Sequence, residues 1–439
     1  RECCLAACAC IPSKMWLDSF PLAVRGGKVC SSDGSRFKIA GVNWYGASDV
    51  YHVVGGLEFA NVDRIASCIR AMGFTAVRLP FSNEMLRPET RVPEGAVSAE
   101  HNPSLQGLSP LEVLDAVVAA LGRAEVAVVL NNHCSFGAWG GEPDQNGLWF
   151  AEGLQSEEQW LEDWTTLASR YREAPHVVGF DLRNEVRPVP SPSFGWAMPS
   201  FPSWGDGGDC DWARATALAA AHLSKVSPEK LIIVERIAFP VQSLADYWEL
   251  DALKQLPAEK LVWAVHAYAW TGPGYFVPSW TRQSAPVLFA LIDYLKWLLV
   301  DWHPLNGEME EEELRETMRS EWGFAIEGGL APVILSEFGC TADEGPELEW
   351  FRRVVRYLSE VDADFFYWPV NVGPKPGPPG SLPSGERGGE ERYGLLTEDW
   401  EPKWGDPRLE LLQTLCPDRV GPEPAVGESE AKQARGMVQ

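Results

Sequence analysis

Short runs of apolar residues recur along the chain, separated by longer stretches in which apolar and polar residues follow a helical period. Eight of these runs are continuous and rich in β-branched or aromatic residues, which is typical of strands buried on both faces of a parallel sheet. The predicted strands are Phe37–Trp44, Ala76–Pro80, Val126–Asn131, Val177–Asn184, Leu231–Glu235, Leu261–Tyr268, Val333–Glu337 and Asp364–Pro369.

The stretches between the runs predict amphipathic helices. In the first, apolar residues recur at helical spacing from Val62 to Met72, and Gly73 follows as a C-terminal stop. Further helices are predicted at Leu111–Leu121, Gln159–Tyr171, Asp211–Val226, Leu288–Trp302, Glu310–Trp322 and Glu347–Leu358. Eight strands, most of them followed by a helix, predict an α/β fold of the (β/α)8 TIM-barrel type. An open doubly wound sheet is the alternative, but the glycine-rich phosphate turn of that fold is absent from the sequence.

The two ends of the chain differ from its middle. Cys3, Cys4, Cys8 and Cys10 fall among the first ten residues, so residues 1–27 are expected to form an N-terminal Cys-rich segment. Residues 28–416 contain all the predicted strands and are assigned to a single catalytic domain. Residues 417–439 have few large apolar side chains and are expected to form a disordered acidic tail.

Charge and hydropathy narrow the class of partner. The chain has 439 residues, and its 62 acidic and 37 basic residues give a net charge of −25. Such a chain is not expected to bind nucleic acid, which needs a basic patch. The apolar stretch Leu288–Trp302 is too short to cross a membrane and contains Asp293, Lys296 and Asp301, so no membrane span is expected. We expect a monomer.

Aromatic residues are the unusual part of the composition. There are 20 Trp, 10 Tyr and 18 Phe, and the share of Trp is well above average usage. Core packing explains many of these residues. Sugar rings also present flat C–H faces that stack on indole, so a carbohydrate-active protein is a second explanation, and composition alone does not choose between the two. Both explanations stay open for Trp44, Trp139, Trp149 and Trp270, which lie at or near the ends of predicted strands.

Polar residues cluster where the predicted strands end. In a barrel, these carboxyl ends meet on one rim, where active sites are built. Taken singly, each residue has an ordinary structural explanation, such as an ion pair or a hydrogen bond in the core. Chance would rarely bring all of them to one rim. The strand ends supply Arg78, His133, Asn184, Glu185, Glu235, His266, Tyr268, Glu337 and Trp368.

These residue types favour glycoside hydrolysis. The HxH and HExxH metal motifs and the GxSxG nucleophile turn are missing from the sequence. Paired carboxylates instead suit acetal hydrolysis, in which one acid protonates the leaving oxygen and the other attacks the anomeric carbon or activates water. No metal and no cofactor are then expected, and a metal-dependent barrel hydrolase is the alternative.

Sequence motifs along the chain support this interpretation. They are GVNWYG (41–46), GFTAVRLPFSNEML (73–86), NNHCSFGAW (131–139), VVGFDLRNEVR (177–187), LIIVE (231–235), WAVHAY (263–268), ILSEFG (334–339) and FYWPVN (366–371). In this order, from about Lys28 to Cys416, they resemble glycoside hydrolase family 5, the cellulase family, and its endoglucanase-like members. The resemblance implies a retaining β-glycosidase on a (β/α)8 barrel.

The resemblance also implies individual roles. Glu185 in Asn-Glu matches the general acid/base, and Glu337 in Ser-Glu-Phe-Gly matches the nucleophile. The other matches bind substrate or position these acids. They are Asn184 for the sugar 2-hydroxyl, Arg78 and Tyr268 for the nucleophile, His133 and His266 for the walls of the cleaved subsite, and Trp368 for stacking beneath the sugar.

A retaining mechanism needs its two carboxyl groups about 5 Å apart. Glu185 and Glu337 are distant in sequence, so only barrel closure can bring them together. We expect Arg78 to keep Glu337 ionised, and the charge of Glu337 to keep Glu185 protonated. Glu235 is interpreted as a structural or sugar-binding partner. Asp181 and Arg183 share a strand face, which predicts an interior ion pair between them.

Departures from the usual family pattern bear on the substrate. Val186 replaces a frequent Pro, Ser336 replaces a frequent Gly, and Asn131 and Asn132 precede His133 where many members have Asp. The leading hypothesis is endo-acting hydrolysis of a β-linked polysaccharide, β-1,4-glucan. The alternatives are the same chemistry on mannan, β-1,3- or β-1,6-glucan or a glycolipid headgroup, and a sugar-binding protein that has lost catalysis. A polymeric, insoluble substrate implies an extracellular, secreted protein.

Overall fold

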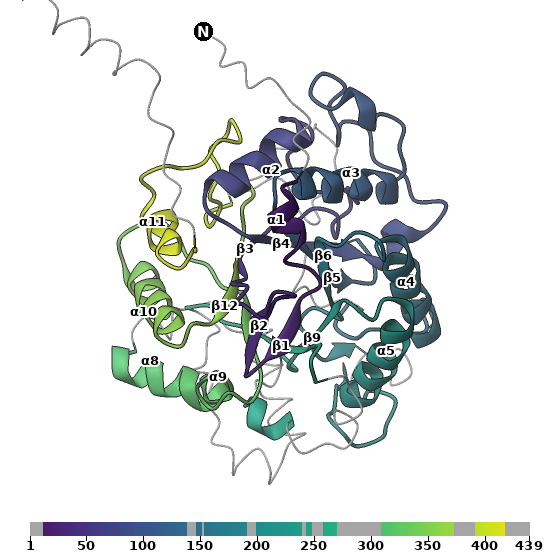
Figure 1. Cartoon of the computed structure of the whole chain (residues 1–439). Helices are drawn as coiled ribbons and strands as arrows, with labels where there is room; N and C mark the ends of the chain where they lie inside the picture. The colour runs from purple at the N-terminus through teal and green to yellow at the C-terminus, as the bar shows by residue number, and fades with distance from the viewer. Residues whose placement is uncertain are drawn as a thin grey trace, which may run out of the picture.

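Eight parallel strands close into a barrel (Figure 1) in the order β10-β11-β12-β3-β4-β5-β6-β9. The computed structural model describes residues 12–137, 146–151, 153–190, 199–238, 243–247, 258–269, 309–372 and 391–417. The barrel strands are β3 (Ala40–Asn43), β4 (Ala76–Ser82), β5 (Ala127–Cys134), β6 (Val177–Asp181), β9 (Leu231–Glu235), β10 (Leu261–His266), β11 (Val333–Glu337) and β12 (Asp364–Tyr367). All eight predicted strands and the predicted fold class are confirmed.

Helices cover the outside of the barrel (Figure 1). They include α2 (Val62–Ala71), α3 (Pro110–Arg123), α4 (Glu157–Arg170), α5 (Trp212–Val226), α8 (Glu311–Met318), α9 (Phe324–Glu327), α10 (Pro346–Glu360) and α11 (Pro407–Gln413). The helix predicted at Glu310–Trp322 begins as α8 and continues through a π-helical turn at Arg319–Gly323 into α9. Helix α11 was not among the predicted helices, and the predicted helix Leu288–Trp302 lies outside the described residues.

An N-terminal hairpin closes the amino-terminal end of the barrel. Strand β1 (Ala23–Arg25) pairs with β2 (Lys28–Cys30) in antiparallel register, and the short helix α1 (Lys14–Leu17) precedes it. Phe20, Leu22 and Val29 pack in one buried cluster with side chains from the barrel strands. The expected boundary at residue 28 therefore divides a hairpin, and we propose that the barrel unit begins before it.

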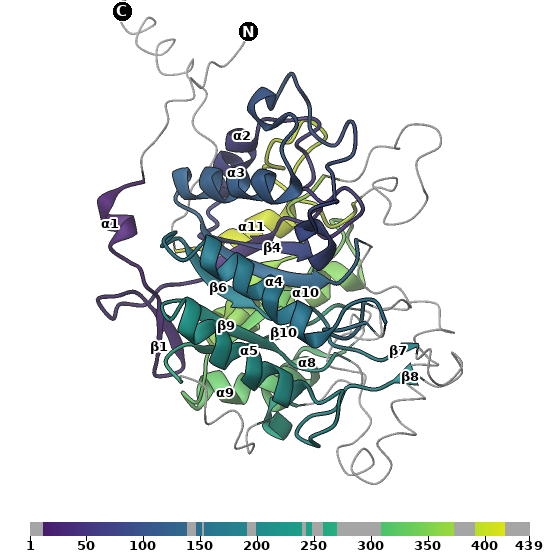
Figure 2. The same ribbon diagram turned by 90° about the vertical axis from the view of Figure 1, so that its right-hand side faces the viewer.

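The opposite end of the barrel holds the loops that follow the strands. Figure 2 shows β1 at one end of the barrel and the small ribbon of β7 (Val189–Pro190) and β8 (Pro199–Ser200) at the other. This ribbon follows β6, so it marks the carboxyl-terminal rim. Residues at the ends of β4, β5, β6, β9, β10 and β11 therefore face the end that the hairpin leaves open.

Two of the tryptophans considered for a cleft are packing residues. Trp44 and Trp149 are both 0% exposed. The indole of Trp44 donates to the Gly55 carbonyl at 2.8 Å, and that of Trp149 donates to Glu157 Oε2 at 2.7 Å. Buried indoles with a satisfied N–H are typical of a core. Trp139 and Trp270 lie outside the described residues.

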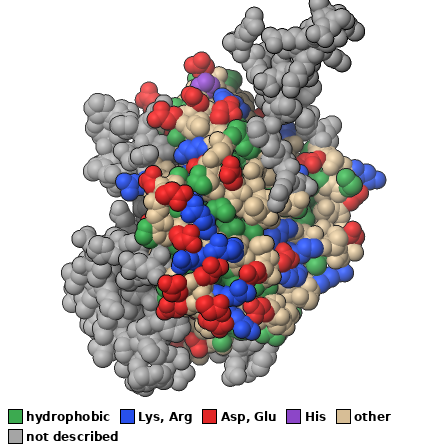
Figure 3. Space-filling model, turned by 90° about the vertical axis from the view of Figure 1, so that its left-hand side faces the viewer, with side chains coloured by type: hydrophobic (Ala, Val, Ile, Leu, Met, Phe, Trp, Pro, Cys, Tyr) green, Lys and Arg blue, Asp and Glu red, His purple; other side chains and the backbone are tan. Residues whose placement is uncertain are grey.

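The outer surface mixes charges of both signs. Figure 3 shows acidic and basic side chains interspersed on the face that bears α8, α10 and α11. Ion pairs join α10 to α8, among them Arg356–Glu311 at 2.9 Å and Arg315–Glu360 at 2.5 Å. This face therefore has no continuous row of basic side chains that could bind the phosphate backbone of a nucleic acid. Among the helices that the structure describes, none is both long and apolar enough to cross a bilayer.

Candidate active site

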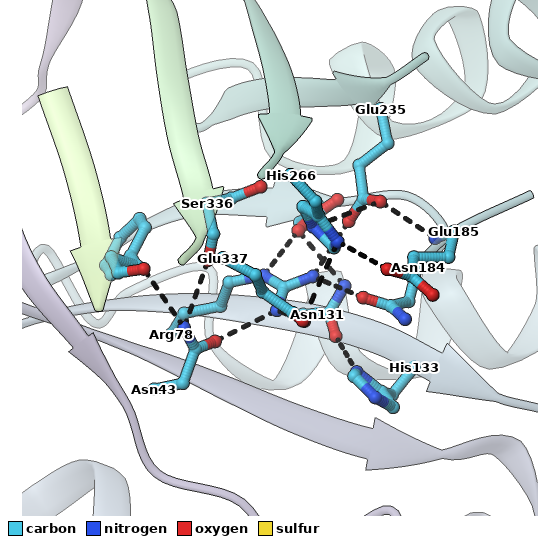
Figure 4. A network of polar contacts seen from close by, with 12 residues as sticks. Asn43, Arg78, Asn131, His133, Asn184, Glu185, Glu235, His266, Ser336 and Glu337 are labelled. Atoms are coloured by element: carbon cyan, nitrogen blue, oxygen red, sulfur yellow. Dashed lines mark hydrogen bonds and ion pairs between the residues drawn. The ribbon is translucent and has the colours of Figure 1, made fainter. Parts of the chain in front are cut away.

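The guanidinium of Arg78 is the centre of the polar network on the rim (Figure 4). Its side chain is 0% exposed, and β4 directs it into the barrel. An arginine has five N–H donors in one plane, and each finds an acceptor here. The acceptors are Asp181 Oδ2 at 2.7 Å, Asn43 Oδ1 at 2.9 Å, Glu337 Oε1 at 2.6 Å, Asn184 Oδ1 at 2.7 Å and Glu235 Oε1 at 2.7 Å.

These acceptors come from strands all around the barrel. Asn43 ends β3, Asp181 ends β6, Glu235 ends β9 and Glu337 ends β11. Barrel closure thus sets the geometry of the network, because no two of these strands are adjacent in the sheet except β6 and β9. A buried charge needs this degree of pairing to persist in an apolar interior.

Glu337 is held through both of its oxygens. Its Oε1 accepts from Arg78, and its Oε2 accepts from the Tyr268 hydroxyl at 3.1 Å. His266 Nδ1 lies 3.6 Å from the same Oε2. A register shift between Val265 and His266 places His266 opposite Glu337 in the β10–β11 ladder. The carboxylate is therefore fixed in orientation by neighbours on two other strands.

Glu185 lies in the turn after β6 and is held less tightly. Its side chain is 23% exposed, and its φ of +39° is unusual for a residue with a side chain. The backbone N–H of Glu185 donates to Glu235 Oε2 at 2.8 Å, and its carboxylate Oε1 lies 2.9 Å from His266 Nδ1. The strained turn therefore aims this acid at the cluster while leaving it accessible, as strain at functional sites often does.

Glu235 links the two halves of the network. Its Oε1 accepts from Arg78, its Oε2 accepts from the backbone of Glu185, and His266 Nε2 lies 3.4 Å from Oε2. Burial alone would raise the pKa of Glu235, but His266 and Arg78 outweigh it and lower that pKa to about 2. Glu235 is thus an ionised residue that holds the turn bearing Glu185, which is consistent with a structural role.

The pKa values of the two leading acids separate in the opposite sense to the expected one. Burial raises the pKa of Glu337, against the opposing charges of His266 and Arg78. Burial also acts to raise the pKa of Glu185, but the hydrogen bond and charge of His266 outweigh it and lower that pKa. His266 resists the effect of its own burial, because Glu235, Glu337 and Glu185 raise its pKa well above the usual value. At neutral pH and without substrate, the proton between His266 and Glu185 therefore lies on His266.

A second chain of polar contacts supports His133. The ring Nδ1 lies 2.8 Å from Asn131 Oδ1, and Asn131 Nδ2 donates to Asp181 Oδ2 at 3.0 Å. The guanidinium that reaches Asp181 is that of Arg78, whereas Arg183 donates to Asn132 at 3.0 Å. The predicted pairing of Asp181 with Arg183 is thus replaced by a pairing across strands.

Aromatic rings line one side of the cluster. Trp368, half-buried at the end of β12, stacks with His133 at 5.7 Å and with Tyr45 at 5.3 Å between ring centroids. Tyr268 stacks with Tyr393 at 6.3 Å. The rings give the polar cluster a flat apolar wall, which suits the C–H face of a sugar.

Metal-binding capacity within the described residues coincides with the two acids. Oxygen atoms of Glu185 and Glu337 and a ring nitrogen of His266 all lie within 4.8 Å of one another. Arg78 and Tyr268 already occupy the Glu337 oxygens, so a cation there would meet a fixed positive charge. The expectation that no metal is needed stays a prediction.

The structure brings the predicted site residues together. Arg78, Asn184, Glu185, Glu235, His266, Tyr268 and Glu337 form one hydrogen-bonded cluster, to which His133 and Trp368 are attached through Asn131 and ring stacking. Asn43 and Asn131 also belong to the cluster, although the sequence patterns did not predict them as members. Asn43 ends β3, so the strand-end rule that found the others could have found it. Asn131 lies two residues before His133 on β5, and only its hydrogen bonds to Asp181 and His133 identify it as a member of the cluster.

The thiols near the site are not bonded to each other. Cys134 and Cys340, which flank His133 and Glu337 in sequence, are both buried, and no disulfide joins them. Burial raises the pKa of Cys340 above its usual range, which keeps the thiol protonated and unreactive. The lack of a bond between these two cysteines agrees with the separation of β5 from β11 in the barrel order.

Comparison with known proteins gives a family match. The model of the family described as Cellulase (glycosyl hydrolase family 5) matches residues 30–373. An endoglucanase of Paenibacillus polymyxa is 27% identical over 400 residues, covering 88% of this chain and 85% of the relative. The major extracellular endoglucanase of Xanthomonas campestris pv. campestris is 29% identical over 404 residues, covering 88% of this chain and 69% of the relative.

Solved structures give the same picture. The catalytic domain of the major Xanthomonas endoglucanase is similar with a TM-score of 0.66 and 27% identity, covering 90% of this chain and 99% of that chain. The endocellulase of the archaeon Pyrococcus horikoshii is similar with a TM-score of 0.67 and 26% identity, covering 91% and 99%. Two variants of that archaeal enzyme, each with one glutamate replaced by alanine, are solved as complexes with cellotetraose.

Replacing Arg78 tests the network directly. Arg78→Lys keeps the charge but offers three donors on a flexible stem in place of five in a plane. We expect the free energy of unfolding to fall by about 3–5 kcal/mol, because buried acceptors lose their partners. The turnover number should fall as well, because Glu337 loses the hydrogen bond that orients it. Denaturant titration and initial rates measure the two effects.

The matched control lies at the other end of the barrel. Arg36 also has all five donors engaged, with Asp362, Asp364 and backbone carbonyls. Arg36→Lys should lower stability in the same direction but leave the turnover number of the folded enzyme unchanged. Equal loss of turnover in both variants would mean that Arg78 acts through stability alone.

Proposed function

Since the chain belongs to the cellulase family, glycosyl hydrolase family 5, and is a glycoside hydrolase, we propose that it cleaves β-1,4-glucan internally by double displacement. Glu337 is the nucleophile and Glu185 is the general acid/base. The observation that carries this proposal is that carboxylate oxygens of these two residues lie within 4.8 Å of one another. Retaining enzymes hold their acids about 5–5.5 Å apart, whereas inverting enzymes leave about 6.5–9.5 Å for a water.

The environment of Glu337 suits a nucleophile. Attack on the anomeric carbon requires an ionised oxygen with a fixed direction. Arg78 and Tyr268 each hold one oxygen of Glu337, so the carboxylate cannot rotate away from the sugar. As the glycosyl–enzyme bond forms, the negative charge of Glu337 is lost. The Tyr268 hydroxyl can still donate to Oε2, because an ester oxygen also accepts hydrogen bonds.

The environment of Glu185 suits an acid that receives its proton from a neighbour. The leaving oxygen needs a proton, but Glu185 is ionised in the substrate-free site. His266 Nδ1 lies 2.9 Å from Glu185 Oε1. Transfer of its proton leaves both groups neutral, a change that is favoured once a bound sugar excludes water from the pair. After Glu185 has given the proton to the leaving oxygen, the attacking water restores it.

The remaining groups suit recognition of a glucose ring. Asn184 uses its Oδ1 to accept from Arg78, which leaves its N–H donors available to a substrate, and the oxygen of a 2-hydroxyl can accept from them. Trp368 supplies the stacking wall beside His133. Hydrogen bonds to the 2-hydroxyl that strengthen as the ring flattens contribute to transition-state stabilisation.

The choice of β-1,4-glucan comes from the relatives. The Paenibacillus and Xanthomonas proteins are named endoglucanases, and the archaeal enzyme is solved with cellotetraose. We propose the same substrate class and endo action here. Mannan, other β-glucans and a glycolipid headgroup stay as alternatives, because the departures at Val186, Ser336 and Asn131 lie beside the subsite.

We further propose that the protein acts outside the cell as a monomer. A polymeric glucan does not cross a membrane, and one relative is named as extracellular. The proposed catalytic unit comprises residues 28–416 and the part of the β1–β2 hairpin that lies before residue 28. After Pro417, the predicted tail of residues 417–439 lies outside the described residues.

A panel of polysaccharides tests linkage and mode of action. We expect release of reducing ends from β-1,4-glucan, with several product lengths early in the reaction, and little release from mannan or β-1,3- or β-1,6-glucan. A chelator should not change the rate. Preference for mannan, or a single short product from the start, would overturn the substrate or the endo assignment respectively.

Azide rescue tests the roles of the two acids. Glu337→Ala should abolish hydrolysis of an aryl β-cellobioside, and added azide should yield the α-glycosyl azide after a single inversion. Glu185→Ala is the matched control. It should lose about 10²–10⁴-fold on poor leaving groups and yield the β-glycosyl azide. Nuclear magnetic resonance identifies the anomers, and exchange of the two products would reverse the assignment.

Replacing His266 tests the proton source. His266 and Glu185 share a proton, so the alkaline limb of the kcat/KM profile reports its loss from the pair, at the raised pKa of His266. In His266→Asn, the proton must stay on Glu185 itself, so we expect the alkaline limb to move to lower pH. His176→Asn, far from the cluster, is the control and should leave the limb in place. A limb that does not move in His266→Asn would exclude the shared proton.

A further inference from the structure

A relay of hydrogen bonds leads from Arg78 to His133. The proposed catalytic steps do not use the part of this relay beyond Arg78. The relay runs from Arg78 Nε to Asp181 Oδ2 at 2.7 Å, from Asn131 Nδ2 to the same oxygen at 3.0 Å, and from Asn131 Oδ1 to His133 Nδ1 at 2.8 Å. Figure 4 shows the last contact, with Asn131 between the cluster and the ring. Every residue of the relay is buried.

We propose that Asn131 is a positioning residue that fixes His133 as a neutral ring with its proton on Nδ1, so that Nε2 only accepts hydrogen bonds from the substrate. The inference rests on the proposed function only in that the group facing Nε2 is a sugar hydroxyl. The state of the ring itself follows from the relay.

The direction of each hydrogen bond follows from the first donor. Arg78 has donors and no acceptor, so Asp181 Oδ2 must accept from it. Asp181 can hold a proton on its other oxygen, Oδ1, which has no hydrogen-bond partner among the described residues, and Oδ2 remains an acceptor in either state. Asn131 must then turn its N–H₂ group toward Asp181. Its carbonyl oxygen is left for His133, and a carbonyl can only accept, so Nδ1 carries the proton.

The charges around His133 keep the ring neutral. The charged or titratable groups that face it are Arg78 on β4, Glu235 on β9, His266 on β10 and Arg187 after β6. Burial is the largest effect, and with Arg78 it lowers the pKa of His133 well below the usual value. An amide at position 131 adds no charge to oppose this, whereas a carboxylate there would favour the imidazolium.

A neutral ring of this tautomer selects among substrates by hydrogen-bond direction. Nε2 of such a ring has a lone pair and no proton. The sugar group that it faces must therefore be a donor, as a hydroxyl is and an ether oxygen or a fluorine is not. His133 is thus expected to reject a ring that is substituted at that position.

Nitrogen NMR of the histidine rings reads the proposed state in the intact protein without substrate. His133→Gln identifies the signals of His133. We expect its Nδ1 to be protonated, its Nε2 to be unprotonated, and neither to titrate between about pH 5 and pH 8. A protonated Nε2, or a titration in that range, would overturn the proposal. This result is independent of catalysis, so failure of the proposed function on the polysaccharide panel would leave it intact.

Two variants separate the relay from a general effect of packing. Asn131→Leu removes the acceptor, so the Nε2-protonated tautomer should become populated and KM should rise by about 3- to 10-fold. Asn132→Leu is the matched control. Asn132 is an equally buried amide on the same strand, but its side-chain contacts are with Asn83, Trp160, Arg183 and the Cys134 carbonyl. It should leave the tautomer of His133 unchanged. The same tautomer shift in both variants would contradict a specific role for Asn131.

Substrate analogues test the direction of the contact. In a set of cellobiosides with one hydroxyl replaced by hydrogen or by fluorine, the position that faces Nε2 should lose equally with either replacement, by about 3- to 10-fold in kcat/KM. Fluorine can accept weakly but cannot donate. Retention of activity by the fluorine analogue over the hydrogen analogue at that position would show that Nε2 donates, and would overturn the proposal.

Discussion

The buried guanidinium of Arg78 is the interaction on which the rest of the site depends. Its five donors meet acceptors from four other strands of the barrel, so the network can form only when the barrel is closed. The same contacts leave each partner with a defined remaining function. Asn184 keeps donors, Asn131 is turned toward His133, and Glu337 presents a fixed oxygen. The stability of the interior and the arrangement of the site are therefore one set of hydrogen bonds.

The charge balance of the cluster explains where its protons lie. Asp181, Glu235 and Glu337 surround Arg78, which supplies one positive charge, and Glu185 adds a fourth carboxylate beside His266. The excess of carboxylates raises the pKa of His266 until it adds a second positive charge, and burial beside Glu235 raises the pKa of Asp181 to about 7. Protons are thus shared out by position within the cluster, and a substrate that displaces water from one part of it shifts protons in the others.

Sequence patterns predicted the barrel and most of the rim, because both depend on local signals. Continuous apolar runs identify strands buried on both faces, and strand ends identify the rim. The partners within the rim depend instead on register between strands distant in sequence. The irregularity between Val265 and His266 brings His266 beside Glu337, and no local pattern reveals it. For the same reason the pairing of Asp181 with Arg78, and the sense in which the acids' pKa values separate, could not be predicted.

The hairpin and the relay both depend on contacts between segments that are distant in sequence, so the pattern of a single strand does not predict them. The β1–β2 hairpin lies outside the repeat of strand and helix, yet Phe20, Leu22 and Val29 close the barrel interior, because an open barrel end would expose apolar side chains to water. Asn131 looks like a neutral substitution beside a histidine. Its effect arises because Arg78 sets the direction of every hydrogen bond that follows. A departure from a family pattern is thus interpretable only once the donor that orients it is known.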